Sequence, residues 1–514
     1  MSGPQEEALI GAQAQTIDRK DVAKGAGLAA VARLGALIEV IAQPAYTWMF
    51  GLAGYGVYVV LWAAINILTD LFDLGLAKAL QRIVPATGDR ERQHAAVRFA
   101  LLAGTGAGLV VAVIVALAAP WIAESISAPE SVRPILPRAI AIFAFSLPLW
   151  IFIEIATGAA RAMRAFGPEI RLRIFWEQVA RLVFAALFYF AGFGVEGLLL
   201  GHLASLVLTS ILSWQLLGRF FDLHLLLHVP VPMALRREAI KAGIALQPPW
   251  LARRVYSDLP PILLNLMLPG VSGATAAGLF GIARKIASIP LIVRLSFLYV
   301  LAPLSSAQAA TKRRGIGPLF SFSTHITVLF ALPIAGFMML VAADVLTAFA
   351  PGAEAALPVV LILLLGRSVE AALGPATPIV EMTGHRALPL INSILGLALW
   401  LGLAAWLVPL AQAVGMAVSV TAAIIVTALL AIFELWWSDR LSPFGFGFWR
   451  ALLASLAGIA LLWVAGEVVA GFGQRIRALT LLALFFPTLW LILKLGLVRD
   501  DKAGLGKLAA RLRL

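Results

Sequence analysis

The chain contains no cysteine and has little charge for its length. Asp, Glu, Lys and Arg make up 13% of its 514 residues, against about 25% in a typical soluble domain. The low charge argues against a soluble globular protein. The missing cysteine excludes disulfides, thiol catalysis and cysteine metal sites.

Signatures of enzymes and cofactor sites are also missing. The sequence has no Walker A motif, and its six histidines show no metal-binding spacing. Gly192, Gly194 and Gly197 match GxGxxG, but a predicted tight turn between apolar helices surrounds them rather than a strand and a helix. We therefore expect neither an enzyme nor a bound cofactor or metal.

Long apolar runs dominate what is present. Hydrophobic residues make up 61% of the chain, and the mean hydropathy is +0.94. Apolar runs of 18 or more residues are typical of transmembrane helices, which need about 20 residues to cross a bilayer. The sequence predicts an all-α polytopic membrane protein with about fourteen spans, near residues 26–49, 55–80, 97–119, 138–158, 174–193, 196–217, 240–267, 275–302, 317–342, 356–377, 387–408, 412–436, 448–470 and 477–497.

The net charge of +13 comes from basic residues in the short connections between these spans. Because these residues are not clustered with aromatic side chains, we do not expect nucleic acid as a partner. Alternate connections, near Gly51, Gly194, Gly270, Ala353 and Ala411, carry no Lys or Arg. The positive-inside rule then predicts that both termini lie in the cytosol. The exceptions are Arg133, Arg138, Arg475 and Arg477.

Similar segments about 220 residues apart predict two six-helix lobes. Gly56-Val57-Tyr58 corresponds to Gly278-Leu279-Phe280, and Val195 to Val414 in the short turns before spans 6 and 12. We expect a cytosolic tail (1–24), an N-lobe (25–217), a cytosolic interfacial linker (218–238), a C-lobe (239–437), helices 13 and 14 (447–498) and a basic cytosolic tail (499–514). The last tail fits either a short amphipathic helix on anionic lipid or a frayed segment. Parallel repeats of this kind enclose a central cavity with substrate sites between them.

Charged residues inside the predicted spans are the best candidates for that cavity. A charge at mid-bilayer costs at least ~2.5–3.5 kcal/mol, so it normally faces a partner or a polar cavity. Arg33 and Glu39 lie in the first span, where Arg33 either snorkels to the interface or faces the cavity. Asn66, Asp70 and Asp73 share one face of the second span. That face either holds a coupling proton or sodium ion or pairs with cations of another helix.

Spans 7 and 8 carry the largest number of cations. Arg254 and Asp258 are spaced for an ion pair, and Arg253 points about 100° away from Arg254. The pairs Pro248–Pro249 and Pro260–Pro261 should kink or unwind this helix. Arg284 and Lys285 lie deep in span 8, and Arg294 follows them. These cations either pair across the lobes or bind an anion. Elsewhere, Glu177 with Arg181 and Arg367 with Glu370 have the spacing of self-neutralising pairs.

Several segments resemble those of a known transporter family. They are Gly54-Tyr55-Gly56-Val57-Tyr58, Asp73-Leu74-Gly75-Leu76 with Ala79 and Arg82, the run from Gly278 to Lys285, Ala302-Pro303, Gly384-His385-Arg386 and Val414-Gly415. Over most of residues 25–500 the chain resembles the polysaccharide transporter (oligosaccharide flippase) family of the multidrug/oligosaccharidyl-lipid/polysaccharide flippase superfamily.

The resemblance implies a function in the bacterial inner membrane. It implies that an oligosaccharide on undecaprenyl diphosphate, for O-antigen, capsule or exopolysaccharide, is flipped from the inner to the outer leaflet by alternating access. Membrane lipids, a polysaccharide polymerase and other assembly proteins are the implied partners. Arg33, Arg284 and Lys285 best match the cationic cavity positions of relatives.

Two other functions are open from the sequence. A lipid II flippase shares fourteen spans and a cationic cavity. A cation-coupled multidrug antiporter usually stops at twelve spans and favours acidic residues in its cavity, so spans 13 and 14 and the arginines argue against it.

Overall fold

The computed structural model describes residues 36–163, 171–292, 316–373, 375–382, 387–505, 509–510 and 512–513. All regular secondary structure in these ranges is helical, as the sequence predicts for a chain that must satisfy its backbone inside lipid. The predicted tail 1–24, Arg33 and Arg294 lie outside the described residues.

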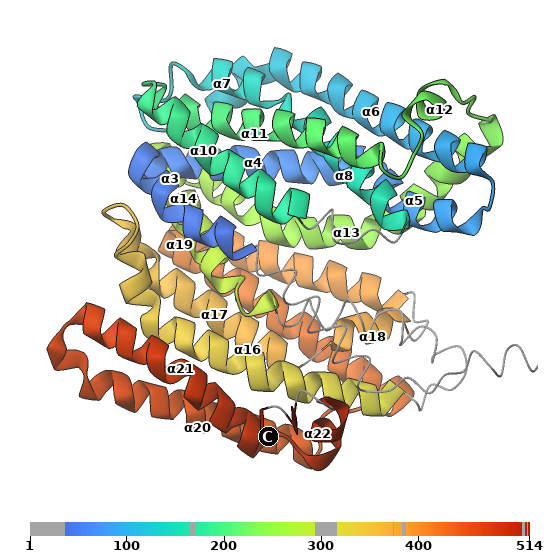
Figure 1. Cartoon of the computed structure of the whole chain (residues 1–514). Coiled ribbons are helices and arrows are strands. Elements are labelled where there is room, and N and C mark those ends of the chain that lie inside the picture. Colours follow the sequence, from blue (N-terminus) through green and yellow to red (C-terminus); the bar gives the residue numbers. More distant parts are fainter. Residues whose placement is uncertain are drawn as a thin grey trace, which may run out of the picture.

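The N-terminal half forms one bundle of helices (Figure 1), which we call the N-terminal bundle. It consists of α3 (Ala36–Phe50), α4 (Leu52–Phe72), α5 (Leu76–Ala86), α6 (Arg90–Ser125), α7 (Leu136–Phe143), α8 (Ser146–Ala162), the π-helix η1 (Arg171–Trp176), α10 (Glu177–Phe190) and α11 (Gly194–Leu217). The short α12 (Leu223–His228) follows in the predicted interfacial linker. Asp222 caps α12, and hydrogen bonds from the Leu225 and His224 backbone N–H groups lower the pKa of its carboxyl.

The C-terminal bundle consists of α16 (Ile316–Leu346), η3 (Ala353–Ala356), α17 (Leu357–Ala372), α18 (Ala376–Met382), α19 (Ala387–Asp439), α20 (Phe446–Val468), η4 (Ala470–Phe472) and α21 (Gln474–Gly496). A short helix, α22 (Arg499–Leu505), follows. Its Asp501 is buried and lies 3.0 Å from Nδ1 of His325 on α16. The basic tail therefore begins with a helix that docks on the bundle.

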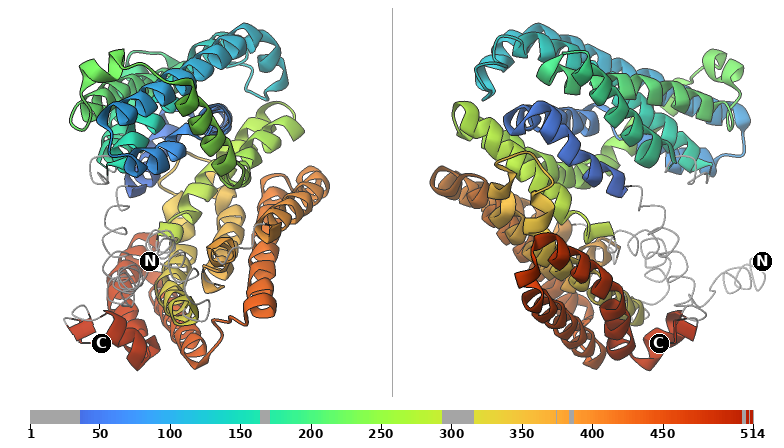
Figure 2. Two further views of the ribbon diagram at one scale, coloured as in Figure 1. Left: turned by 90° about the vertical axis from the view of Figure 1, so that its right-hand side faces the viewer. Right: turned by 60° about the vertical axis from the view of Figure 1, so that its left-hand side comes forward.

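Between the bundles lie α13 (Met233–Met267) and α14 (Gly270–Ala287). Helix α13 packs on α4 and α5 and also reaches α19, while α14 packs on α4 and α17. Figure 2 shows that the two bundles diverge from this connection toward the end where α12 and α22 lie. Both helices are therefore placed to present side chains to either bundle.

Nine helices in the described part are long and apolar enough to cross a membrane. One of them, α19, contains a break at Ala411 and Gln412, and Gln412 has a φ of 46°. This break falls where the sequence predicts the turn between spans 11 and 12. The total of fourteen spans stays a prediction.

Two predicted spans are interrupted in the structure. The second span ends as α4 and resumes as α5 after Leu74 (φ 53°) and Gly75 (φ 66°). Span 8, predicted as one helix over 275–302, ends as α14 at Ala287, two residues after Lys285. By contrast, α13 continues as helix through both proline pairs, so the predicted unwinding there is wrong. Interrupted helices are common where transporters bind their substrates.

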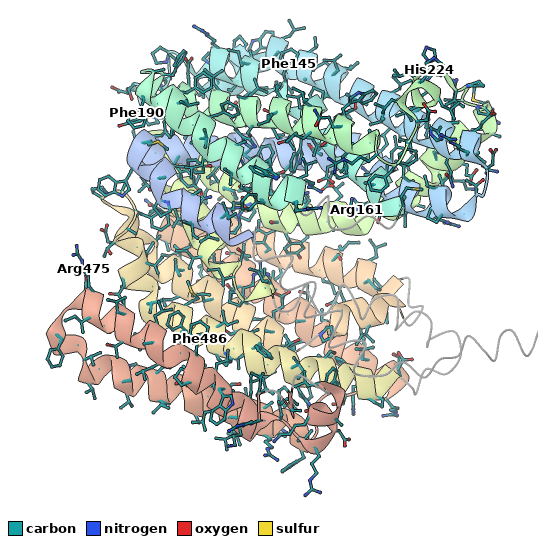
Figure 3. The ribbon with its side chains drawn as sticks, in the orientation of Figure 1. Phe145, Arg161, Phe190, His224, Arg475 and Phe486 are labelled. Atoms are coloured by element: carbon teal, nitrogen blue, oxygen red, sulfur yellow. The ribbon has the colours of Figure 1, made fainter. Side chains whose placement is uncertain are left out.

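The bundles meet closely at one end. Phe190 and Arg475 lie at this end, which the loop charges predict to be the outer one, and His224 lies at the other (Figure 3). Here the indole N–H of Trp48 on α3 donates to the Ala348 carbonyl at 2.9 Å, and Thr47 Oγ1 accepts from the Ala350 N–H at 3.3 Å. On α4, Gly56 lies directly against the backbone of Ala274 and Gly278 on α14. Small residues allow helix backbones in membranes to approach this closely.

Candidate substrate site between the two bundles

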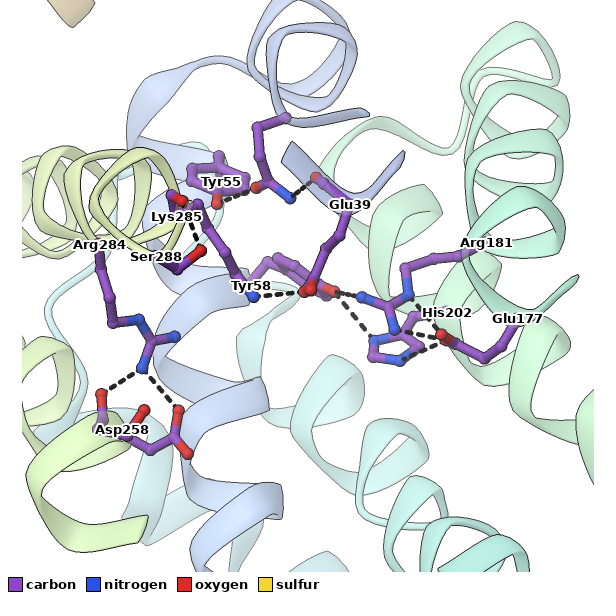
Figure 4. Close-up of polar contacts among 12 residues, drawn as sticks. Glu39, Tyr55, Tyr58, Glu177, Arg181, His202, Asp258, Arg284, Lys285 and Ser288 are labelled. Carbon is purple, nitrogen blue, oxygen red and sulfur yellow. Dashed lines mark hydrogen bonds and ion pairs between the residues drawn. The ribbon is translucent and has the colours of Figure 1, made fainter. Parts of the chain in front are cut away.

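We call the contact of α13 and α14 with the N-terminal bundle the interface. An ion pair between Lys285 on α14 and Glu39 on α3 joins its two sides. Figure 4 shows the two side chains directed at one another. Glu39 lies in the first turn of α3, and its neighbour Gln43 donates to the Glu39 backbone carbonyl at 2.7 Å and accepts from the hydroxyl of Tyr55. The Lys285 ammonium is thus held by a carboxylate of the N-terminal bundle.

Arg284 points in another direction from Lys285 and contacts α13 (Figure 4). Its Nη1 donates to Asp258 Oδ1 at 2.7 Å and to the Ser257 carbonyl. Nε and Nη2 make no hydrogen bond within the described residues. Arg284 thus ties α14 to α13.

Arg254 on α13 links to α4 through Asp70. Its Nε donates to Asp70 Oδ2 at 2.5 Å, and its Nη1 lies 3.5 Å from Asp258 Oδ2. Asp70 also lies 3.7 Å from the Lys78 ammonium on α5. The predicted Arg254–Asp258 pair is therefore present, and Asp258 is shared between Arg254 and Arg284. Asp70 pairs with cations of other helices, one of the two alternatives that the sequence leaves open.

The three residues on the shared face of the second span do not act together. Asp70 lies at the interface, whereas Asp73 Oδ1 accepts from the Gly75 backbone N–H at 2.7 Å and stabilises the break between α4 and α5. Asn66 is buried one turn before Asp70. This arrangement groups only Asp70 with the interface cations.

A second charged cluster is enclosed inside the N-terminal bundle. Arg181 on α10 donates to Glu177 one turn earlier, and its Nη1 donates to the hydroxyl of Tyr58 at 3.2 Å. His202 on α11 lies 3.1 Å from the same hydroxyl. All four side chains are buried. The predicted Glu177–Arg181 pair is thus present, with Tyr58 and His202 as further members.

Two other ion pairs have structural roles of a similar kind. Arg367 Nη1 donates to Glu370 Oε2 at 2.8 Å, as their spacing predicts. Glu154 on α8 accepts two hydrogen bonds from Arg173 of η1, at 3.1 and 2.5 Å. The Arg173 guanidinium also lies 4.9 Å from the Trp150 ring centre.

Most of the candidate cavity residues come together in one region. The structure groups Arg254, Arg284, Lys285, Glu39, Asp70 and Asp258 at the contact between α13, α14 and the N-terminal bundle. Arg253 lies on α13, but its side chain is outside the described part, as is the whole of Arg33. Lys78 is the interface cation that the sequence analysis missed. Its position eight residues after Asp70, within the same predicted span, was the signal.

The described residues contain no group of three or more His, Asp or Glu side chains that could hold a metal ion. The chemistry of the interface is that of ion pairs. Three partly exposed cations on two neighbouring helices can bind an anion with several oxygens.

Comparison with known proteins now identifies the family. Residues 22–308, more than half of the chain, match the model of a family described as polysaccharide biosynthesis protein. The chain belongs to this family. Among curated proteins, no sequence matches it significantly.

Solved structures show which fold this polysaccharide biosynthesis protein has. The lipid II flippase MurJ in an inward closed conformation is 11% identical and has a TM-score of 0.69, with 91% of this chain and 99% of the flippase covered. A MATE transporter of Vibrio cholerae is 15% identical with a TM-score of 0.62, over 82% of this chain and 98% of the transporter. A MOP superfamily transporter from Pyrococcus furiosus is 14% identical with a TM-score of 0.58, over 82% and 96%. At these identities the likeness shows the fold alone, and it confirms the transporter fold that the sequence resemblance implies.

Proposed function

We propose that the protein flips an oligosaccharide linked to undecaprenyl diphosphate from the inner to the outer leaflet of a bacterial inner membrane by alternating access. Membership of the polysaccharide biosynthesis family supports a saccharide substrate. The transporter fold supports movement across the membrane. A polysaccharide polymerase and other assembly proteins would receive the product.

The observation that carries this proposal is the set of cations at the interface. Arg254, Arg284 and Lys285 project from two neighbouring helices and are all partly exposed. Arginine binds phosphate oxygens in bidentate fashion, and lysine adds a compact positive charge. A diphosphate supplies oxygens for several such contacts at once. The diphosphate is therefore the part of the substrate that this interface would hold.

The membrane potential favours the proposed direction. Moving roughly two negative charges outward across ~100 mV, inside negative, releases up to ~4–5 kcal/mol. A cationic drug would instead need excess acidic charge. At this interface a cation accompanies each carboxylate of Glu39, Asp70 and Asp258. The antiporter alternative therefore fits the charges less well.

Flipping in proteoliposomes tests the proposal. The protein is reconstituted with undecaprenyl-diphosphate-linked oligosaccharide, and a membrane-impermeant lectin measures the sugar that appears on the other leaflet. The wild type should flip it, and Lys285→Gln should slow flipping by ~10-fold or more, because a charge-assisted hydrogen bond contributes ~1.5–3 kcal/mol. Lys494→Gln, an exposed lysine on α21 away from the interface, is the matched control and should flip normally.

Parallel substrates separate the alternatives. If the wild type flips lipid II but not the oligosaccharide, the protein is a lipid II flippase. If the wild type expels a cationic dye and flips neither lipid, the protein is a multidrug antiporter. Equal flipping by wild type and Lys285→Gln would show that Lys285 does not hold the diphosphate.

A further inference from the structure

The ion pairs of the protein differ in how far solvent and substrate can reach them. The Glu177 side chain is 0% exposed and that of Arg181 is 4%, so this pair is closed to a ligand. At the interface, Glu39 and Lys285 are 25% and 24% exposed. The interface pairs can therefore exchange partners, whereas the enclosed pair cannot.

Each carboxylate of the interface already has a cation. Within the described residues, Arg254, Arg284, Lys285 and Lys78 lie beside Glu39, Asp70 and Asp258. A diphosphate that approached the cations would also approach these carboxylates and be repelled by them. A carboxylate that gives up its cation would lower this repulsion and leave the cation to the diphosphate.

The three carboxylates are not equally easy to displace. Asp258 is 4% exposed and receives both Arg284 and Arg254, and Asp70 is 14% exposed and lies between Arg254 and Lys78. Glu39 is the most exposed of the three, and its carboxylate contacts Lys285 alone among the described residues. Removing Glu39 from Lys285 thus breaks the fewest contacts.

A displaced Glu39 would keep part of its electrostatic stabilisation. Arg181 of the enclosed cluster exerts its positive charge on Glu39 without contacting it, and Figure 4 shows Glu39 between Lys285 and Arg181. The carboxylate can therefore leave Lys285 without losing all cationic stabilisation. Since α3 and α14 lie on opposite sides of the interface, this exchange also removes an ion pair that joins them.

We propose that Glu39 is a placeholder for the substrate: it occupies Lys285 when the site is empty and is replaced there by the diphosphate. Glu39 then lowers the affinity for the diphosphate and makes binding break a link between α3 and α14. This inference rests on the proposed function, because it takes the diphosphate as the ligand of Lys285. It makes Glu39 a specificity-determining residue, since an anion must outcompete it.

Binding measurements on the full chain in nanodiscs test this role. The probe is farnesyl diphosphate, a short polyprenyl diphosphate, titrated calorimetrically. Glu39→Gln keeps the size of the side chain and removes its charge, so it should bind the probe ~10-fold more tightly than wild type. Glu39→Asp keeps the charge and should stay close to wild type. Glu467→Gln, an exposed glutamate on α20, is the matched control and should show no change.

Lys285 variants separate failure of this inference from failure of the proposed function. Lys285→Gln should bind ~10-fold more weakly, and the double variant Glu39→Gln, Lys285→Gln should lose the gain that Glu39→Gln brings alone. If Lys285→Gln weakens binding while Glu39→Gln leaves it unchanged or weakens it, the placeholder role is wrong and the site stands. If wild type and Lys285→Gln bind the probe equally, the diphosphate site itself is wrong.

Discussion

At the scale of single residues, intramembrane charges of this protein fall into two classes. Enclosed pairs such as Glu177 with Arg181 are almost fully buried, whereas the pairs around Lys285 and Arg254 are partly exposed. A buried pair contributes little net stability, but removal of one partner leaves an uncompensated charge in a dry environment. The two classes should therefore respond differently to substitution.

Arg181→Leu tests the enclosed class. It leaves the fully buried Glu177 carboxylate without its guanidinium, so we expect a loss of about 3–5 kcal/mol of stability. Thermal unfolding in detergent should show a clearly lower Tm. The double variant Glu177→Gln, Arg181→Leu should recover much of the loss. Arg90→Ala, which removes an exposed pair with Asp222, is the control and should unfold near the wild-type temperature. A single Arg181 variant as stable as wild type would contradict the assignment.

Residue spacing predicted some of these contacts and could not predict others. Glu177 with Arg181, Arg254 with Asp258 and Arg367 with Glu370 lie within one helix, where a separation of three or four residues fixes their proximity. Lys285 with Glu39 and Arg173 with Glu154 join residues of different helices. Those pairs depend on which helices pack together. The spacing of residues along one helix does not show this.

At the scale of helices, the apolar runs predicted where helices lie better than where they break. Positive φ at Leu74 and Gly75 interrupts the second span, and α14 ends at Ala287 inside a run that reads as continuous. Hydropathy averaged over a long window does not register such breaks, although Asp73 and Gly75 stand at the first and Ser288 and Pro290 at the second. The proline pairs do not unwind α13, since the helix continues through both, and the kink stays a prediction.

The docked helix α22 gives a prediction at this scale. The buried Asp501 contacts His325 of α16, and the indole N–H of Trp490 on α21 donates to the Leu512 carbonyl at 2.8 Å. His325→Ala leaves the buried Asp501 carboxylate without this partner, so α22 should detach more often. Amide hydrogen exchange of residues 499–505 should become at least ~10-fold faster, which corresponds to ~1.4 kcal/mol.

Arg499→Gln, an exposed change on the same helix, serves as the control and should leave exchange in α22 unaltered. Equal exchange in wild type and His325→Ala would show that other contacts hold the helix. Faster exchange in both variants would show that α22 is held by its charge rather than by the buried pair.

At the scale of the molecule, contacts between the bundles lie mainly at the predicted outer end. Trp48 and Thr47 contact the segment after α16 there, and Gly56 lets α4 approach α14. Toward the opposite end the bundles diverge (Figure 2). In an alternating-access cycle the proposed substrate would enter from the inner side, opposite to the end where these contacts lie. The sequence predicted two halves around a central site, but not which end of the interface is closed.

Gly56→Val should oppose closure of the outer end. A Cβ at this position would overlap the Ala274 carbonyl of α14, so α4 and α14 must separate before the larger side chain fits. Because the chain has no cysteine, spin labels can be attached to Phe190→Cys and Phe472→Cys, two exposed positions on opposite bundles. The distance distribution between them should shift to longer values in Gly56→Val, and flipping should fall by ~10-fold or more.

The matched control is Gly106→Val on α6. Gly106 is also a helical glycine, but a Cβ there meets no atom within 4 Å, so both variants carry the same cost of a β-branched residue in a helix. Its label distances and flipping should match those of wild type. An unchanged distance in Gly56→Val would show that α4 and α14 tolerate the side chain without separating. A longer distance with full flipping would show that close contact at Gly56 is not a step of the transport cycle.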